Sequence, residues 1–159
     1  MHVWGDEKTH QVLTTPAGVV FCVVPWTDEQ NRPEVIDAAR PHAVDQICID
    51  VPYHRIDDDI AFWADLTGWE RNPRSHQEFQ SFAQPAHLPL RLLLQRLGPD
   101  DVGGPRAHLD ISAGGHVGDV VKDHVGAGAV VVDEREDWTA LRDPADMLYC
   151  VTSRRPDVR

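Results

Sequence analysis

The sequence predicts an α+β fold built from two copies of one unit, a strand followed by a helix and three further strands. The copies occupy residues 43–98 and 104–153 of the 159-residue chain. The apolar pairs Ile47-x-Ile49 and Leu109-x-Ile111 fall at matching positions in the first strand of each copy. In both copies a glycine follows the helix, as is usual where a helix ends. A repeat of about 50 residues indicates a duplicated structural unit.

The first 42 residues stand outside these two copies. Residues 10–24 predict two strands joined by a Pro-Ala-Gly turn, because proline and glycine supply the backbone angles that a turn requires. Residues 15–22 also match residues 143–150 position by position. We therefore expect the hairpin to be the last two strands of a further copy, the alternative being a chance similarity of two hairpins. Residues 26–41 predict a linker, with a short helix at 34–39.

The first copy begins with a strand at 44–51, in which Gln46, Cys48 and Asp50 point to one face and the intervening apolar residues to the other. Asp57, Asp58 and Asp59 follow, and acidic residues favour the start of a helix. Gly68 ends this helix. Three strands are predicted next, at 69–72, 78–84 and 90–97, before a Gly-, Pro- and Asp-rich boundary at 98–105.

The second copy begins with an alternating strand at 106–112. Ala107, Leu109 and Ile111 point to one face, while the other face carries polar residues, namely Arg106, His108, Asp110 and Ser112. A helix at 116–125 carries one apolar stripe, made of Val117, Val120, Val121 and Val125. This stripe can cover the apolar face of the sheet, which leaves the polar face available for binding.

Charge and composition narrow the range of partners. The net charge is −11, which argues against nucleic acid and anionic membranes as partners, because both attract clustered Lys and Arg. Arg154, Arg155 and Arg159 form the one basic cluster, interpreted as part of a solvated tail at 154–159. No apolar run approaches the ~20 residues of a membrane span, and the first residues do not resemble a secretion signal. Cys22, Cys48 and Cys150 are interpreted as reduced, buried thiols of a cytoplasmic protein.

Five motifs carry a family resemblance, and they occur in this order: Phe62-Trp63-x-x-Leu66-Thr67-Gly68-Trp69, Leu94-Gln95-Arg96, Arg106-Ala-His108-Leu-Asp110-Ile, Gly126-Ala-Gly-Ala129 and Trp138-x-x-Leu141-x-Asp143-Pro144. Residues 43–153 thereby resemble the vicinal oxygen chelate superfamily, which includes glyoxalase I, bleomycin-resistance proteins and extradiol dioxygenases. The glyoxalase-like bacterial branch is the most similar. The resemblance implies paired βαβββ modules that form a curled mixed sheet around a cleft, with the helices on the outer face.

The resemblance also implies positions for a metal. Metal-dependent members place one ligand on the first strand and one on the last strand of each module, which here gives Gln46, Gln95, His108 and Leu148. Leucine cannot bind a metal, and neutral amides bind divalent ions weakly. We therefore expect a degenerate metal site and no cofactor. The alternative is a divalent ion held by His108, with Asp50 or Asp110 as substitute ligands.

A set of residues on the strand faces is predicted to bind a ligand. Polar groups that point into a cleft require partners, which a small organic molecule or water can supply. His108 is the best candidate for acid–base chemistry because imidazole titrates near neutral pH, the alternative being a hydrogen-bonded structural histidine. The predicted ligand-binding residues are Gln46, Asp50, Gln95, Arg106, His108, Asp110, Leu148 and Trp138.

These observations leave three function classes. The first, which the missing ligands favour, is a small-molecule-binding protein like the bleomycin-resistance relatives. The second is a metal-dependent lyase, isomerase or dioxygenase, in which the metal polarises neighbouring oxygens. The third is an interaction protein, because an unpaired hairpin can add its strands to a neighbouring chain. This last reading predicts a homodimer.

Overall fold

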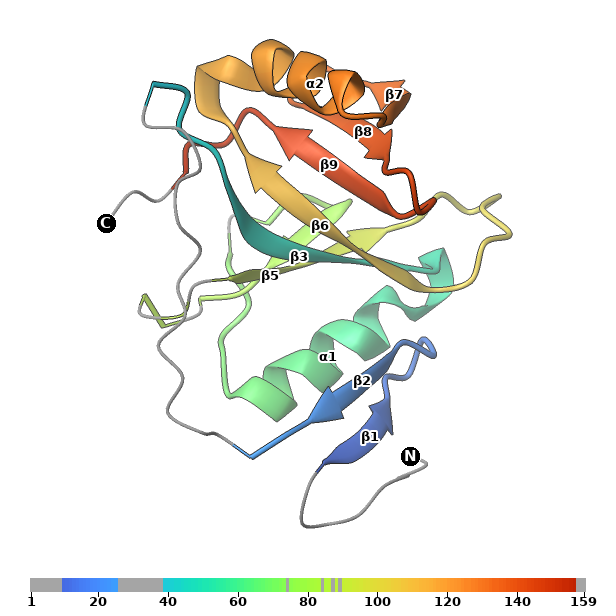
Figure 1. Ribbon diagram of the computed structural model, residues 1–159. Coiled ribbons are helices and arrows are strands. Elements are labelled where there is room, and N and C mark those ends of the chain that lie inside the picture. The colour runs from blue at the N-terminus through green and yellow to red at the C-terminus, as the bar shows by residue number, and fades with distance from the viewer. Residues whose placement is uncertain are drawn as a thin grey trace. The chain divides into compact units, whose positions relative to one another are not determined.

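The computed structural model describes residues 10–25, 39–73, 75–83, 85–86, 88 and 90–156. Within them the chain forms two α-helices, a two-stranded sheet and a seven-stranded mixed sheet in the order β4-β5-β3-β6-β9-β8-β7 (Figure 1). The predicted α+β class is confirmed. Two compact units share the chain. One is drawn from Met1–Asn31, Ile49–Pro85 and Leu92–Ala107, and the other from Arg32–Cys48, Ala86–Arg91 and His108–Arg159.

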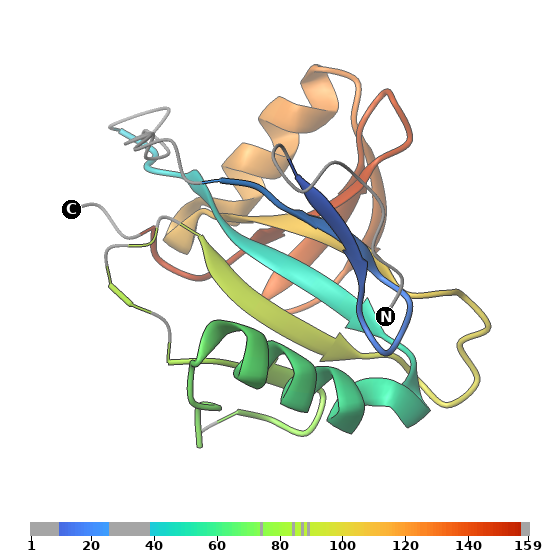
Figure 2. The same ribbon diagram turned by 90° about the horizontal axis from the view of Figure 1, so that it is seen from below.

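The first unit contains the N-terminal hairpin, which forms as predicted. Strands β1 (Gln11–Thr14) and β2 (Val20–Val23) pair antiparallel and form the blue ribbon of Figures 1 and 2. The turn between them places Gly18 at φ 102°, in the left-handed region that favours glycine. The ring of Phe21 packs on Phe62 and Trp63 of the neighbouring helix, at centroid distances of 5.9 and 5.1 Å. The hairpin therefore packs on a helix of its own chain.

That helix, α1 (Ile56–Thr67), follows a short 3-10 turn, η1 (Tyr53–Arg55), after strand β3 (Ala43–Val51). Its first turn holds the three predicted aspartates, which suits the partial positive charge of a helix N-terminus. The side chain at the N-cap itself makes no capping hydrogen bond. Gly68 adopts a left-handed conformation and donates its N–H to the carbonyl of Ala64, which ends the helix as predicted.

The strands after α1 differ from the prediction. Strand β4 (Phe79–Ser81) pairs antiparallel with β5 (Arg91–Arg96), but the strand predicted at 69–72 is reduced to a single bridge between Arg71 and Phe82. Pro73 follows directly, and a proline has no N–H with which to continue a ladder. The helix predicted at 34–39 lies, apart from Ala39, outside the described residues.

The second unit has the predicted order of a strand, a helix and three strands. Strand β6 (Arg106–Ser112) leads through η2 (Gly114–His116) into α2 (Val117–Gly126), and three strands follow. These are β7 (Val130–Glu134), β8 (Trp138–Arg142) and β9 (Leu148–Thr152). Strand β9 lies parallel to β6 and antiparallel to β8, and β8 also pairs antiparallel with β7.

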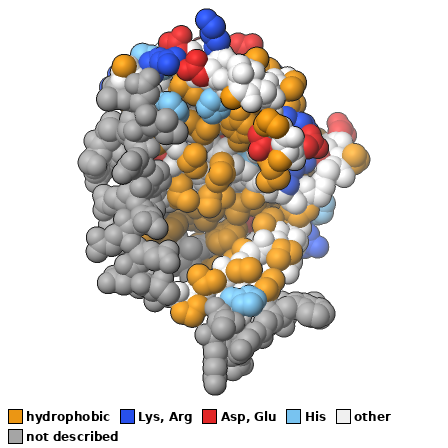
Figure 3. Space-filling view, viewed as in Figure 1, with side chains coloured by type: hydrophobic (Ala, Val, Ile, Leu, Met, Phe, Trp, Pro, Cys, Tyr) orange, Lys and Arg blue, Asp and Glu red, His pale blue; other side chains and the backbone are white. Residues whose placement is uncertain are grey.

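Helix α2 covers one face of this part of the sheet. Val120, Leu141 and Val151 are buried at this contact, and Val117 and Val121 pack against them. The predicted valine stripe is thus confirmed except at Val125, which is 45% exposed. Hydrophobic side chains are visible among polar ones on the part of the surface that holds α2 in Figure 3. The consecutive valines 130–132 of the edge strand β7 are all exposed.

Neither helix in the described part of the chain has the length that a bilayer crossing requires, since α1 has 12 residues and α2 has 10. The three cysteines are free. Cys48 is buried and Cys150 is half-buried, but Cys22 is exposed, which corrects the expectation that all three are buried. Cys22 follows Phe21 on β2, and since Phe21 points toward α1, the side chain of Cys22 points away from it and meets solvent.

Candidate functional site

Strand β6 brings a row of polar side chains to one face of the sheet in the second unit. His108, Asp110 and Ser112 alternate along the strand and are all buried, with exposed fractions of 8%, 4% and 0%. Leu109 and Ile111 point to the other face, and Ile111 packs against the core under α2. The predicted division of β6 into a polar and an apolar face is therefore confirmed for these residues.

Strands β9 and β8 extend this polar side of the sheet. Cys150 lies opposite Asp110 and Thr152 opposite Ser112 in the parallel ladder, and Trp138 lies opposite Thr152 in the antiparallel one. Leu148 precedes Cys150 by two residues and so shares its side. We call this side the polar face. It comprises His108, Asp110, Ser112, Trp138, Leu148, Cys150 and Thr152, and it lies opposite the face that α2 covers.

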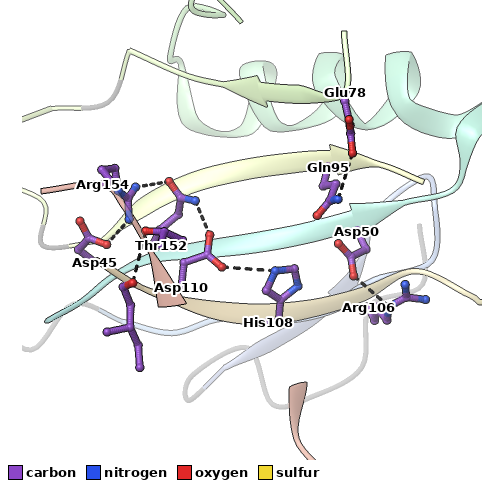
Figure 4. A network of polar contacts seen from close by, with 11 residues as sticks. Asp45, Asp50, Glu78, Gln95, Arg106, His108, Asp110, Thr152 and Arg154 are labelled. Atoms are coloured by element: carbon purple, nitrogen blue, oxygen red, sulfur yellow. Dashed lines mark hydrogen bonds and ion pairs between the residues drawn. The ribbon is translucent and has the colours of Figure 1, made fainter. Parts of the chain in front are cut away.

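Gln46 joins the polar face through Asp110. Its Nε2 donates to Asp110 Oδ2 at 2.5 Å, and its Oε1 accepts a hydrogen bond from Arg154 (Figure 4). Arg154 also forms an ion pair with Asp45. Five of the predicted ligand-binding residues therefore belong to this face or bond to it. Four lie on the face, namely His108, Asp110, Leu148 and Trp138, and Gln46 joins them through its hydrogen bond to Asp110.

Arg154 belongs to this network, although the sequence analysis did not place it at the site. Its side chain is only 25% exposed and is bound on two sides, so the interpretation of this residue as part of a solvated tail is wrong. The physical reason is that Asp45 and Asp110 are buried nearby, and buried carboxylates require a cation or hydrogen-bond donors. In the sequence, the acidic residues Asp45 and Asp110 on predicted strands are the signal that could have indicated a cationic partner.

Burial favours the neutral forms of Asp45 and Arg154 and shifts the pKa of each accordingly. Desolvation raises the pKa of Asp45, and the guanidinium of Arg154 opposes that shift. Desolvation likewise lowers the pKa of Arg154, while Asp45 raises it again. The two shifts have the same cause and opposite signs, as expected of an ion pair withdrawn from water.

Three chemically different donor atoms lie together on the polar face. His108 Nε2 is 3.4 Å from Asp110 Oδ1, and the ligand atoms of His108, Asp110 and Cys150 all lie within 4.8 Å of one another. An imidazole, a carboxylate and a thiol at this spacing can exchange protons or bind a metal ion. Cys150 was not among the residues predicted for the site.

In the first unit, two further predicted site residues meet each other. Asp50 Oδ2 lies 2.9 Å from Arg106 Nε, and the side chain of Asp50 is only 4% exposed (Figure 4). Asp101 lies on the other side of Arg106 at 3.6 Å. Gln95 donates from Nε2 to Glu78 Oε1 at 3.5 Å, a contact that involves neither member of the Asp50–Arg106 pair.

The donors at the four positions that the family implies do not fit a divalent ion. The amide of Gln46 is occupied at both ends by Asp110 and Arg154. Leu148 has no donor atom, and the amide of Gln95 is neutral and directed to Glu78. A catalytic metal centre ordinarily has three His, Cys or carboxylate ligands, and among these four only His108 is of that kind.

Comparison with known proteins identifies the family of this chain. Residues 46–152 match the family model described as a glyoxalase-like domain. No curated protein matches the sequence. A Mn(II)-bound glyoxalase from Novosphingobium aromaticivorans superposes with a TM-score of 0.55 at 13% identity, over 98% of this chain and 55% of that one. The chain thus spans about half the length of that glyoxalase.

Two other solved structures are similar. An NAD-dependent benzaldehyde dehydrogenase from Legionella pneumophila has a TM-score of 0.51 at 14% identity, over 70% of this chain and 97% of that one. A halotolerant catechol dioxygenase has a TM-score of 0.48 at 13% identity, over 90% of this chain and 52% of that one. At 13–14% identity, the similarities to the benzaldehyde dehydrogenase and to the glyoxalase show the fold alone.

Proposed function

Since the chain belongs to the glyoxalase-like domain family, as its resemblance to the vicinal oxygen chelate superfamily predicted, we propose that it binds a small organic molecule at the polar face. No metal at the four family positions takes part. This is the mode of binding expected of a bleomycin-resistance-like relative rather than of a metal-dependent lyase, isomerase or dioxygenase.

The observation that carries this proposal is the contrast between the two faces of the sheet in the second unit. The face under α2 is filled by apolar residues such as Leu141 and Val151, both 0% exposed. The polar face instead buries His108, Asp110 and Ser112. Burying polar groups costs several kcal/mol unless each is paired, whereas apolar residues at these positions would need no partners. A polar ligand is the simplest such partner.

Particular groups on this face suit ligand recognition. His108 can donate or accept a hydrogen bond through its imidazole nitrogens. Gln46 donates to Asp110 Oδ2 and is itself held by Arg154, which fixes the carboxylate before any ligand binds. Trp138, Leu148 and Cys150 are half-buried, and they offer an apolar border next to the polar row. We expect a ligand with a polar group on an apolar or aromatic skeleton.

A thermal-shift screen of the full chain tests this proposal. The protein is first treated with a chelator, then mixed with small aromatic and aliphatic compounds that carry carboxylate, amide or hydroxyl groups. A compound present at 100 times its Kd is expected to stabilise the protein by about 2.7 kcal/mol. Calorimetry on the best compound then gives the Kd.

Two variants of β6 locate the binding. His108→Gln is expected to weaken binding about tenfold, equivalent to about 1.4 kcal/mol, because it removes one interaction with the ligand. Leu109→Gln is the matched control, since residue 109 is the next position on the strand, points to the opposite face and is 45% exposed. The proposal fails if no compound binds, or if Leu109→Gln weakens binding as much as His108→Gln.

We further propose a cytoplasmic location, which is supported by the three free cysteines. A homodimer also remains a proposal.

A further inference from the structure

We propose that His108, Asp110 and Cys150 form a binding site for a thiophilic divalent cation of the zinc type, with Nε2, Oδ1 and Sγ as its ligands. All three residues belong to the second unit and lie on its polar face. The site shares His108 with the four family positions, but its other two ligands, Asp110 and Cys150, are not among them. It does not depend on the small-molecule binding proposed above.

The separations between the donor atoms suit a metal better than a hydrogen bond. The 3.4 Å between His108 Nε2 and Asp110 Oδ1 is long for a hydrogen bond between charged partners. Two ligands at 2.0–2.1 Å from a tetrahedral zinc ion are about 3.3–3.4 Å apart. A zinc-bound sulfur is about 3.6 Å from its neighbours, while these donor atoms lie within 4.8 Å of one another. Closing the site therefore changes no separation by more than about 1.2 Å.

Asp110 shows the clearest sign of a missing positive charge. Its Oδ2 accepts a hydrogen bond from Gln46, but its Oδ1 is buried and receives no hydrogen bond from the described residues. A buried carboxylate oxygen without a donor is unfavourable, and a cation between Oδ1 and the imidazole satisfies it. Gln46 then acts as the outer partner that orients a metal-binding carboxylate, and Arg154 in turn fixes Gln46.

The backbone already holds the donors in register. Asp110 and Cys150 are direct neighbours in the parallel ladder of β6 and β9, and His108 follows from the alternation of β6. A site built on paired strands is more rigid than one on loops.

The mixture of donors selects the metal. A thiolate with an imidazole favours Zn²⁺ or Co²⁺ over Mg²⁺ and Ca²⁺, which prefer oxygen. Three protein ligands leave a fourth position open to water or to an organic ligand, as at catalytic zinc sites. The thiolate and the carboxylate together neutralise the charge of the dication.

Titration of the reduced, full-length chain with Co²⁺ tests this site, because a thiolate ligand gives cobalt a charge-transfer absorption in the near ultraviolet. We expect saturation at one equivalent, with displacement by Zn²⁺. Cys150→Ser is expected to abolish the charge-transfer band and to weaken binding by at least about 100-fold, since loss of an outer partner alone costs 10- to 100-fold. Cys22→Ser is the matched control and keeps both band and affinity, because Cys22 lies on the hairpin of the first unit.

A second measurement needs no variant. Zn²⁺ is expected to slow the alkylation of Cys150 in the wild-type chain, followed by mass spectrometry, and to leave that of the exposed Cys22 unchanged. The proposal is overturned if the wild-type chain binds no stoichiometric Co²⁺, if Cys150→Ser retains the band, or if Zn²⁺ does not protect Cys150. Failure here leaves the ligand screen unaffected, because that screen is run after chelation.

Discussion

At the scale of single residues, Arg154 supplies the positive charge next to two buried side chains, Asp45 and Gln46, that lie more than 100 positions away in the sequence. It bonds to Asp45 and to Gln46, and Gln46 passes the contact on to Asp110. Desolvation raises the pKa of Asp45, so the buried carboxylate is unfavourable without the guanidinium. Removing one partner of such a pair leaves an uncompensated charge, which is usually more destabilising than the pair is stabilising.

We predict that Arg154→Met lowers the free energy of unfolding by about 2–3 kcal/mol, somewhat less than for a fully buried pair because the side chain is 25% exposed. Urea denaturation measures this loss. Arg155→Met is the control, since Arg155 is exposed and its loss is expected to matter by no more than about 0.5 kcal/mol. Asp45→Asn added to Arg154→Met is expected to restore part of the stability. Equal losses for the two single variants would contradict the assignment.

At the scale of elements, one aspartate ties the hairpin to helix α1. Asp59 is 0% exposed, although it lies in the first turn of a helix next to exposed Asp57 and Asp58. Its carboxylate accepts hydrogen bonds from the backbone N–H of Ala17 at 2.8 Å and from Thr15 Oγ1 at 3.1 Å. Desolvation raises its pKa above the usual 3.8, although both hydrogen bonds act in the opposite direction.

Asp59→Ala is expected to lower the free energy of unfolding by about 1–3 kcal/mol, because it leaves the donors of the turn unpaired. Amide hydrogen exchange in β1 and β2 is expected to become faster. Asp58→Ala serves as the control, since Asp58 is exposed and pairs with the exposed Arg55 across one helical turn. If Asp58→Ala loosens the hairpin as much, Asp59 is not the link.

Asp59 also predicts a pH dependence. A carboxyl whose pKa is raised on folding binds protons more tightly in the folded state, so its contribution to stability falls as pH rises from 3.8 through the folded value. The stability of the wild-type chain relative to Asp59→Asn is therefore expected to increase on acidification from pH 7 to about 4. Urea denaturation at both pH values checks this, and parallel pH profiles for the two proteins would refute it.

At the scale of the whole molecule, the edges of the two sheets are the feature that bears on assembly. The seven-stranded sheet has two ends, β4 and β7, and the hairpin forms a separate two-stranded sheet. The turn of the hairpin and Phe21 have partners on α1, but the second strand and the residue after it also expose apolar side chains: Val20 is 65% exposed, Val23 45% and Val24 64%. Exposed apolar residues on a strand with an unpaired edge are consistent with pairing between two chains.

The predicted homodimer has a mass of twice the 17.8 kDa of one chain, which light scattering coupled to gel filtration measures. Val20→Lys combined with Val23→Lys is expected to yield monomer, because lysine on an edge strand opposes pairing. Val125→Lys is the control, since Val125 is equally exposed but lies on α2. A monomeric wild-type chain contradicts the prediction.

The sequence determined the element order, the hairpin, the two-faced strand β6, the valine stripe of α2 and the family, because all of these depend on periodicities within a few residues of one another. It placed a strand at 69–72 wrongly, since the effect of Pro73 on a ladder depends on the pairing partner.

Only the tertiary structure decided which side chains meet. Gln46 and Asp110 are separated by 64 positions, and Asp45 and Arg154 by 109. The register of β6 on β9 likewise set Cys150, rather than Leu148, opposite Asp110. Such contacts result from the packing of distant strands, and a local hydrophobic pattern fixes the face on which a side chain lies without fixing its neighbour on the next strand.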